Sequence, residues 1–285
     1  MKGQTFYLTC GHTLGGRPGL GLQIKGQIKG QTFYLFFAKS LGFCCGIGQS
    51  GLDGREPGDR LPGVEAGATL AIETSTPRAS VALVTADGAI EQRFFQSDRS
   101  HNAVLFGPLR ELLVAVEKSG ERVGRILVGS GPGSYSGTRV GIAAAQGVAM
   151  AVSAPVAAVP SVLALDGSAG LRGLMVIGDA RRGTWWVARV ASRRLMESPV
   201  LLDAEQLRAV VREAVDSGWE LASMESSVYP LDPSLCKAIR RVDPSAAGLW
   251  MAWAAADEAQ RQAWTADPPR PMYLKPPHIT SAHRV

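Results

Sequence analysis

The sequence lacks any apolar run long enough to cross a lipid bilayer. Among its 285 residues the longest candidate, residues 34–48, is interrupted by Lys39 and is rich in glycine, whereas a spanning helix needs about 18 or more consecutive apolar residues. The N-terminus also lacks a basic start followed by a continuous apolar segment, the pattern of a signal peptide. We therefore expect a cytoplasmic protein that does not insert into a membrane.

Metal-ligand patterns are missing as well. The four cysteines show no CxxC spacing, Cys44 and Cys45 being adjacent, and the four histidines include no HxxxH pair. A structural zinc site draws four such ligands from short, regular spacings. The sequence therefore predicts no metal site, and its thiols are expected to be reduced.

A strong excess of one charge is missing from most of the chain. The formal net charge is +5, but residues 1–68 hold seven Lys and Arg against four Asp and Glu, which leaves 23 against 21 for residues 69–285. The net charges of the two parts are thus +3 and +2. A basic surface of the kind that binds a nucleic-acid backbone is not indicated by this distribution.

The first 68 residues differ in kind from the rest. The heptapeptide at residues 2–8 recurs identically at residues 29–35, and residues 24–27 begin a partial third copy. Sixteen of the 33 glycines lie before residue 69, and two full copies are too few for a stacked repeat protein. We expect a disordered, glycine-rich extension here, and whether it belongs to the natural product stays open.

The most informative motif is the glycine-rich stretch Gly131–Gly141. A short apolar strand at 125–130 precedes it, and a helix of small apolar residues at 140–152 follows it. A loop at the start of a helix offers free N–H groups and the positive end of a dipole, which suits a phosphate. A tight turn that lets the helix pack closely on a sheet explains the glycines equally well. The stretch is neither a Walker A loop nor a complete dinucleotide fingerprint.

Alternating strand and helix patterns continue through residues 69–285. Strands are predicted at 69–73, 79–85, 89–96, 125–130, 155–159, 174–177 and 184–190, and helices at 100–118, 140–152, 203–217 and 245–263, with another helix beginning near residue 161. Such alternation predicts an α/β body. We expect a first lobe at 69–170 and a second, smaller or degenerate lobe at 171–285, with a boundary near 167–173.

Two motifs together resemble one known family. They are the stretch LAIETST at residues 70–76 and the glycine-rich stretch at 131–141, and in this combination they resemble the bacterial TsaB (YeaZ) family of tRNA threonylcarbamoyladenosine biosynthesis. Shorter matches lie at 100–101, 145–147, 177–181 and 271–275. The resemblance covers residues 69–276 and implies an actin/Hsp70-like (ASKHA) fold of two RNase H-like lobes.

The resemblance also implies where a phosphate would lie. In catalytic relatives of this fold the first strand ends in an Asp that organises metal and phosphate, whereas this chain has Glu73, one methylene longer. The phosphate or nucleotide contacts that we expect are Glu73, Thr74, Ser75, Gly131, Gly133, Ser134, Gly137 and Arg139. The neighbouring TsaD family carries an HxExH metal motif in its first helix, where this chain offers only His101. We therefore expect no catalytic residues and no metal.

An auxiliary role needs a partner surface. The 140–152 helix is apolar nearly all round, and such a helix needs cover on both faces. The resemblance implies pairing with a TsaD-like catalytic subunit, or a homodimer, through first-lobe helices. The interface candidates are His101, Val104, Leu105, Leu109, Leu112, Ala144, Gly147 and Val148. A TsaE-like ATPase and, indirectly, tRNA are the further partners implied, with no firmly bound cofactor but ATP or ADP considered at the subunit interface.

An alternative function stays open at this point. The same fold could serve an autonomous nucleotide-binding ATPase or kinase that uses Glu73, Thr74, Ser75 and the 131–137 backbone around a phosphate. A glycopeptidase is less well supported, because the sequence offers neither metal ligands nor a recognisable Ser–His–Asp arrangement.

Overall fold

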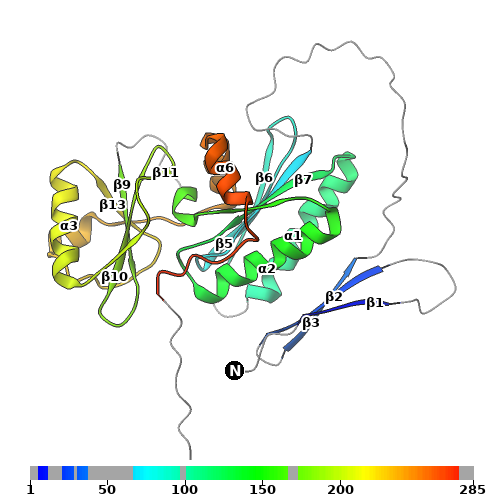
Figure 1. The fold of residues 1–285 in the computed structure, drawn as a ribbon, viewed down its shortest axis with the longest axis horizontal. Coiled ribbons are helices and arrows are strands. Elements are labelled where there is room, and N and C mark those ends of the chain that lie inside the picture. Colours follow the sequence, from blue (N-terminus) through cyan, green and yellow to red (C-terminus); the bar gives the residue numbers. More distant parts are fainter. Residues whose placement is uncertain are drawn as a thin grey trace, which may run out of the picture. The chain divides into compact units, whose positions relative to one another are not determined.

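The computed structural model describes residues 6–11, 21–28, 31–37, 67–96, 101–165 and 173–275. The chain divides into two compact units, Met1–Arg60 and Leu61–Val285, whose elements are labelled in Figure 1. Within the described residues, none of the helices combines the length and the apolar character needed to cross a membrane.

The repeated heptapeptide of the N-terminal unit contributes to strands. The three strands β1 (Phe6–Gly11), β2 (Gly21–Ile28) and β3 (Gln31–Phe37) form an antiparallel sheet in that order. The first copy enters β1, the partial copy lies in β2 and the second copy enters β3. The aromatic residues of these segments favour an extended chain.

The first lobe is built on a five-stranded sheet. Its strands are β4 (Ala68–Glu73), β5 (Arg78–Val84), β6 (Ile90–Gln96), β7 (Val123–Gly129) and β8 (Val156–Val159). The spatial order is β6-β5-β4-β7-β8. The first three strands form an antiparallel meander, and β7 and β8 run parallel to β4. Every residue of β4 is buried, as expected for a central strand covered on both faces.

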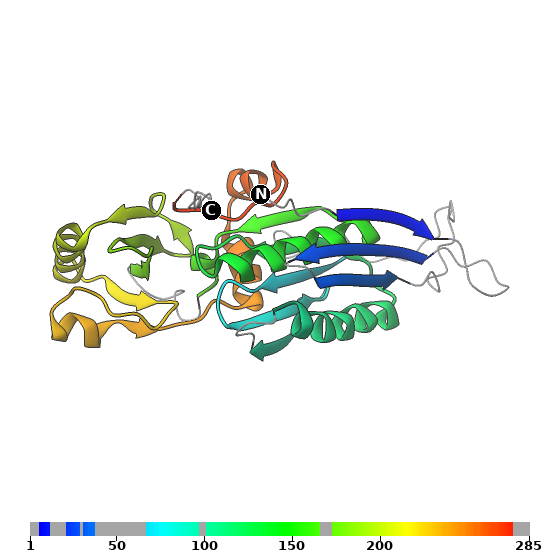
Figure 2. The ribbon, with the colours of Figure 1, turned by 90° about the horizontal axis from the view of Figure 1, so that it is seen from below.

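Helices α1 (His101–Ser119) and α2 (Tyr135–Val152) cover one face of this sheet. Figure 2 shows them beside the first-lobe strands. The apolar residues Leu105, Leu109 and Leu112 recur at helical spacing and are buried against the sheet. Helix α2 begins at Tyr135, five residues earlier than predicted, because the Ser134 side chain caps it by accepting the Gly137 N–H at 3.1 Å.

The second lobe is built on a six-stranded sheet that resembles the first in arrangement. Its elements are β9 (Leu174–Asp179), β10 (Trp185–Ala191), β11 (Arg194–Leu195), β12 (Val200–Leu202), α3 (Ala204–Asp216), β13 (Glu220–Ser223), α4 (Pro233–Ala238) and β14 (Arg240–Arg241). The order is β11-β10-β9-β13-β14, and β12 also pairs with β10. In each sheet the first strand lies between the second strand and a parallel strand, which is β7 in the first lobe and β13 in the second.

Two differences from the predicted elements lie between and after the lobes. The helix expected near residue 161 is the short 3₁₀ helix η1 (Ser161–Ala164). The helix expected at 245–263 is two helices, α5 (Ala246–Ala255) and α6 (Glu258–Thr265). Asp257 separates them by forming a capping box with Gln260 at the start of α6. The predicted boundary at 167–173 lies almost wholly outside the described residues.

The C-terminal helix α5 packs on the first lobe, although it follows the second lobe in the chain. One buried cluster joins Ala71 and Leu127 of the first sheet with Val176 of the second sheet and with Leu249 and Trp253 of α5. The first sheet is thus covered by α1 and α2 on one face and by α5 on the other. Two α/β lobes, each built on its own sheet, confirm the predicted two-lobe architecture.

Candidate functional site

The predicted phosphate contacts gather at one edge of the first sheet. Strands β4 and β7 are parallel, so their carboxyl ends lie together, which is where open α/β sheets bind ligands. After β4 the chain enters the turn formed by residues 74–77, and after β7 it enters the glycine-rich loop at residues 130–134. The structure therefore brings together seven of the eight candidates, and only Arg139, one turn into α2, points elsewhere.

The glycine-rich loop packs directly on the turn after β4. The Ser134 N–H donates to Ser75 O at 2.7 Å. A Cβ added at Gly133 would lie 2.5 Å from the same oxygen, and Gly133 has a φ of +157°. Glycine is required at this position because any side chain would push the loop off the turn.

The polar groups of the loop are bound within the protein. The Gly131 N–H donates to Ser161 Oγ at 3.0 Å, and the Ser161 N–H donates to Gly131 O at 2.8 Å. The Gly137 N–H is taken by the Ser134 cap. Three N–H groups that a phosphate would use, those of Gly131, Ser134 and Gly137, are thus already donated to protein oxygens. Between the two interpretations of this loop, the geometry favours a tight turn over an anion cradle.

Helix α2 approaches β4 closely through a second glycine. Thr74 Oγ1 donates to Gly137 O at 2.8 Å. A Cβ added at Gly141 would lie only 2.2 Å from Thr74 Oγ1. The glycines of this motif therefore act in helix–strand packing, and the Thr74 hydroxyl is directed at the helix rather than at solvent.

Glu73 is sealed inside the first lobe. Its side chain is 0% exposed, and its Oε1 accepts the Ser75 N–H at 2.7 Å. Its Oε2 and the Ser75 Oγ are buried without a hydrogen-bond partner. Burial raises the pKa of the Glu73 carboxyl, and the nearby Ser75 and Ser161 groups only partly oppose that rise. A carboxyl in this environment cannot reach a metal or a phosphate at the surface.

Oε2 of Glu73 fills the space beside β7. A Cβ added at Gly129 would lie 2.1 Å from Glu73 Oε2 and 2.7 Å from Ser161 Oγ. The glycine that ends β7 is therefore needed to accommodate the longer carboxyl. In this chain the end of the first strand is a packed internal cluster.

Arg139 takes part in an aromatic contact at the start of α2. Its guanidinium lies 5.1 Å from the Tyr135 ring centroid, and its NH1 donates to Tyr135 Oη at 2.5 Å. Tyr135 also stacks on Tyr273, with 5.3 Å between ring centroids. Arg139 thus contacts Tyr135, the residue whose ring stacks on Tyr273.

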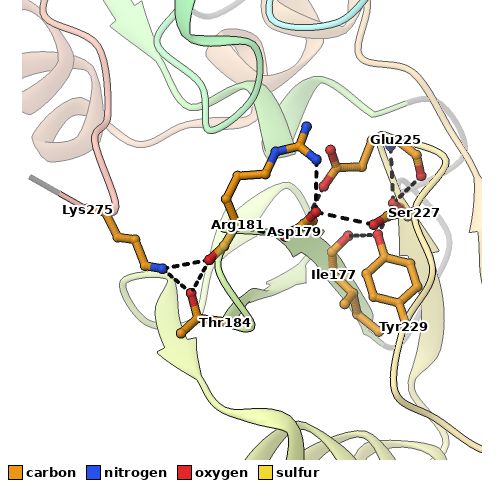
Figure 3. Close-up of polar contacts among 9 residues, drawn as sticks. Ile177, Asp179, Arg181, Thr184, Glu225, Ser227, Tyr229 and Lys275 are labelled. Atoms are coloured by element: carbon orange, nitrogen blue, oxygen red, sulfur yellow. Dashed lines mark hydrogen bonds and ion pairs between the residues drawn. The ribbon is translucent and has the colours of Figure 1, made fainter. Parts of the chain in front are cut away.

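The second lobe places an acidic residue at the position that corresponds to Glu73. Asp179 ends β9, the first strand of its sheet, as Glu73 ends β4 (Figure 3). Asp179 Oδ1 accepts the Arg181 N–H at 2.6 Å, and Oδ2 pairs with Arg181 NH1 at 2.9 Å. The signal for this position in the sequence was an acidic residue at the end of the first strand of each lobe.

Tyr229 is hydrogen-bonded to the backbone near the end of β9. Its hydroxyl donates to Ile177 O at 3.2 Å (Figure 3). The same hydroxyl lies 2.7 Å from Ser223 Oγ. Burial raises the pKa of Tyr229 to about 12. Among the described residues, no three His, Cys, Asp or Glu side chains gather in a way that could hold a metal ion.

Most of the predicted partner contacts are core residues of this chain. Leu105, Leu109, Leu112, Ala144 and Val148 are all buried in the cluster between the helices and the first sheet. Their side chains therefore cannot form a surface for another molecule, and in this respect the prediction is corrected. The predicted interface residues lie mainly on the side of each helix that faces the core.

The outer sides of α1 and α2 present different residues from those on the core-facing sides. Val104 is exposed and Gly147 is half-buried, and the side chain of His101 lies outside the described residues. Helical spacing places these positions on one surface with other exposed or half-buried residues. We call this surface the docking face and define it by Val104, Gly107 and Val114 of α1 and Ala143, Gly147 and Met150 of α2.

Comparisons with known proteins match this chain to the TsaD family model and to TsaB proteins. The family model for TsaD, tRNA N6-adenosine threonylcarbamoyltransferase, matches residues 95–240. The tRNA threonylcarbamoyladenosine biosynthesis protein TsaB of Escherichia coli (strain K12) is 31% identical over 122 residues, which are 41% of this chain and 52% of that protein. TsaB of Bacillus subtilis (strain 168) is 32% identical over 116 residues, 40% of this chain and 51% of that protein. These matches span about half the length of the curated relatives.

A solved structure agrees with the sequence matches. YeaZ from Pseudomonas aeruginosa superposes with a TM-score of 0.52 at 27% identity and covers 73% of this chain and 100% of that chain. A second crystal structure, of an uncharacterized protein with similarity to peptidase YEAZ from the same organism, gives 0.53 at 26% identity and the same coverage.

Proposed function

We infer the function of this chain from one premise, that it belongs to the TsaB (YeaZ) family. We propose that it is a non-catalytic partner subunit of the complex that transfers threonylcarbamoyl to the adenosine adjacent to the tRNA anticodon. It acts by dimerising with a TsaD-like catalytic subunit, has a TsaE-like ATPase as a further partner, and reaches tRNA through the complex. The proposal places the chain in the cytoplasm with the tRNA.

The observation that carries the non-catalytic role is the sealed carboxyl of Glu73. A group that performs acid–base chemistry or holds a metal must contact the reacting atoms. Glu73 is 0% exposed, and the loop beside it donates its N–H groups internally. This arrangement supports a scaffold whose chemistry is performed by another subunit.

The start of α1 supports the same role. The resemblance implies a metal motif HxExH at this place in a TsaD-type enzyme, whereas residues 101–105 read His-Asn-Ala-Val-Leu. One histidine without the acidic residue and the second histidine cannot supply the ligands of a catalytic iron or zinc.

The docking face is the surface that we assign to the partner. It presents small residues such as Ala143 and Gly147, which allow another helix to approach closely, and apolar side chains such as Val114 and Met150, which gain from burial. A Cβ added at Gly107 meets nothing within 4 Å, so the face is open at that point. The same face serves a homodimer in the absence of the TsaD-like subunit, and ATP or ADP at the subunit junction is part of the proposal.

Substitution of Met150 by aspartate tests the docking face. Met150 is 56% exposed, so the change leaves the fold intact but buries an unpaired charge in the proposed interface, which is costly. We expect the affinity for the TsaD-like subunit of the same organism to fall at least about tenfold, or 1.4 kcal/mol, in titration calorimetry. Arginine at Ala144 is a poorer test because that side chain is 7% exposed and belongs to the core.

Val228→Asp is the matched control for this experiment. Val228 is 92% exposed and lies in the second lobe, so the same change in charge at that site should leave the affinity unaltered. The assay of function combines the TsaD-like and TsaE-like proteins with unmodified tRNA, with and without this chain. Full formation of the modified nucleoside without it would disprove the proposed role.

The alternative of an autonomous ATPase or kinase is tested separately. It requires phosphate contacts from Glu73 and the glycine-rich loop, both of which are engaged inside the protein. Turnover of ATP and magnesium by the purified chain alone, abolished by Glu73→Gln, would favour that alternative over a partner subunit.

A further inference from the structure

We propose that residues 271–275 form a strap that holds the two lobes at a fixed angle. The segment follows α6 and runs past the start of α2 toward the second lobe (Figure 1). It contacts the first lobe at one end, the second lobe at the other, and the shared core between them. This role is independent of the proposed function and concerns the motion of the two lobes.

The first anchor lies on the glycine-rich loop. The Met272 N–H donates to Ser130 O at 2.7 Å, directly beyond the end of β7. The Tyr273 ring stacks on Tyr135 of α2 with an interplanar angle of 28°. Stacked aromatic pairs contribute beyond the area that they bury, so the strap is held to the first lobe by a backbone bond and by a ring contact.

The second anchor lies on the turn between β9 and β10. Lys275 Nζ donates to Arg181 O at 2.9 Å and also to Thr184 Oγ1 (Figure 3). Between the two anchors, Leu274 packs against the buried cluster to which both sheets contribute. A rotation of one lobe against the other would therefore have to break one of the two anchors.

The turn that receives Lys275 is itself strained. Arg181, Arg182 and Gly183 have φ values of +66°, +58° and +68°, and non-glycine residues adopt this region at a cost. Such a conformation persists where surrounding contacts over-determine it. The Arg181 carbonyl accepts from Thr184 Oγ1 at 2.9 Å as well as from Lys275, which supplies that support and ties the shape of the turn to the strap.

Hydrogen exchange measured residue by residue tests the strap in the full chain. If the strap couples the lobes, removing the anchor in one lobe must loosen the other lobe, because coupling between two sites is reciprocal. Tyr135→Ala should raise amide exchange of residues 180–184 in the second lobe. Thr184→Val should raise exchange of the Met272 amide and of residues 131–134 in the first lobe. We expect increases of up to about tenfold, which corresponds to the upper end for loss of one hydrogen bond or one stacked ring pair.

Lys275→Met and Lys237→Met form a matched pair. Both remove an ammonium and keep the length of the chain, but Lys237 is exposed on α4, away from the strap. Lys275→Met should raise exchange in both segments and Lys237→Met in neither. Unchanged exchange of the buried strand β5 shows that a variant is folded. A Met272 amide that is unprotected in the unaltered protein, or increases confined to the substituted lobe, would overturn the proposal.

Discussion

Two glycine-to-alanine substitutions in helices should change stability in opposite directions. On helix propensity alone each change stabilises a helix interior by about 1 kcal/mol. For Gly107 in α1 part of that gain is lost, because Pro108 follows it and a Cβ on the residue before a proline is disfavoured in the helical conformation. Apart from its chain neighbours and the helix's own backbone, a Cβ at Gly107 meets nothing within 4 Å. For Gly141 in α2 the new methyl group would lie 2.2 Å from Thr74 Oγ1, so the packing cost must be set against the gain.

The magnitude at Gly141 follows from the contacts of Thr74. Overpacking a buried site costs about 1–3 kcal/mol, and displacing the Thr74 hydroxyl also loses its 2.8 Å bond to Gly137 O, worth about 1 kcal/mol. After subtraction of the helix gain, we expect Gly141→Ala to destabilise the protein by about 1–3 kcal/mol. The midpoint of thermal unfolding should fall by about 2–4 °C for each kcal/mol.

Urea unfolding followed by circular dichroism measures both variants. The double variant Thr74→Ala/Gly141→Ala provides the internal check, since removal of Oγ1 leaves the new methyl group without its closest neighbour, and the two effects should then be less than additive. If Gly141→Ala stabilises the protein as Gly107→Ala does, then α2 does not approach β4 as closely as described, and the packing explanation of the glycine-rich motif fails.

Three further predictions follow from single contacts. The raised pKa of Glu73 means that ionisation of its carboxyl opposes folding. The stability that is present below the ordinary pKa of 4.5 is therefore lost as the pH rises through the pKa of the folded state. In unfolding curves recorded across that pH range, the stability of Glu73→Gln should increase progressively relative to that of the unaltered protein. Tyr229→Phe should remove the phenol that titrates at about 12, seen by ultraviolet absorbance, and cost about 1 kcal/mol through loss of the bond to Ile177 O. Gly178→Ala should destabilise by about 1–3 kcal/mol in urea unfolding, because the new methyl group would lie 2.1 Å from the Trp186 ring.

The sequence predicted the first lobe well because its signals are local. The buried strand β4 follows from a short continuous apolar run, and α1 follows from apolar residues at helical spacing. The start of α2 was placed five residues late because Tyr135 and Ser136 do not belong to the apolar run. The Ser134 cap was the signal that would have placed it correctly.

The resemblance named Glu73, Ser75 and Ser134 among the expected phosphate contacts, and their role as such contacts stays a prediction. In the structure Ser75 is hydrogen-bonded both to Glu73 and to Ser134. Burial and hydrogen-bond partners decide whether such a group faces a ligand or the interior, and neither can be read from spacing. Spacing also could not show that Leu105 and Ala144 are core residues, since an apolar residue in a helix can pack either against its own sheet or against another protein.

The spacing of residues in the sequence could not predict on which lobe α5 packs. Its first free N–H groups are received by side chains of the first lobe, Ser80 Oγ accepting from Ala246 at 2.8 Å and Gln92 Oε1 accepting from Ala247 at 2.7 Å. A helix start buried without such acceptors would lose free energy, so two polar residues more than 150 positions earlier help to select the face on which α5 packs. With α5 there, β4 is covered on both faces. Glu73 at the end of β4 is instead enclosed by its own neighbours, Ser75, Gly129 and Ser161.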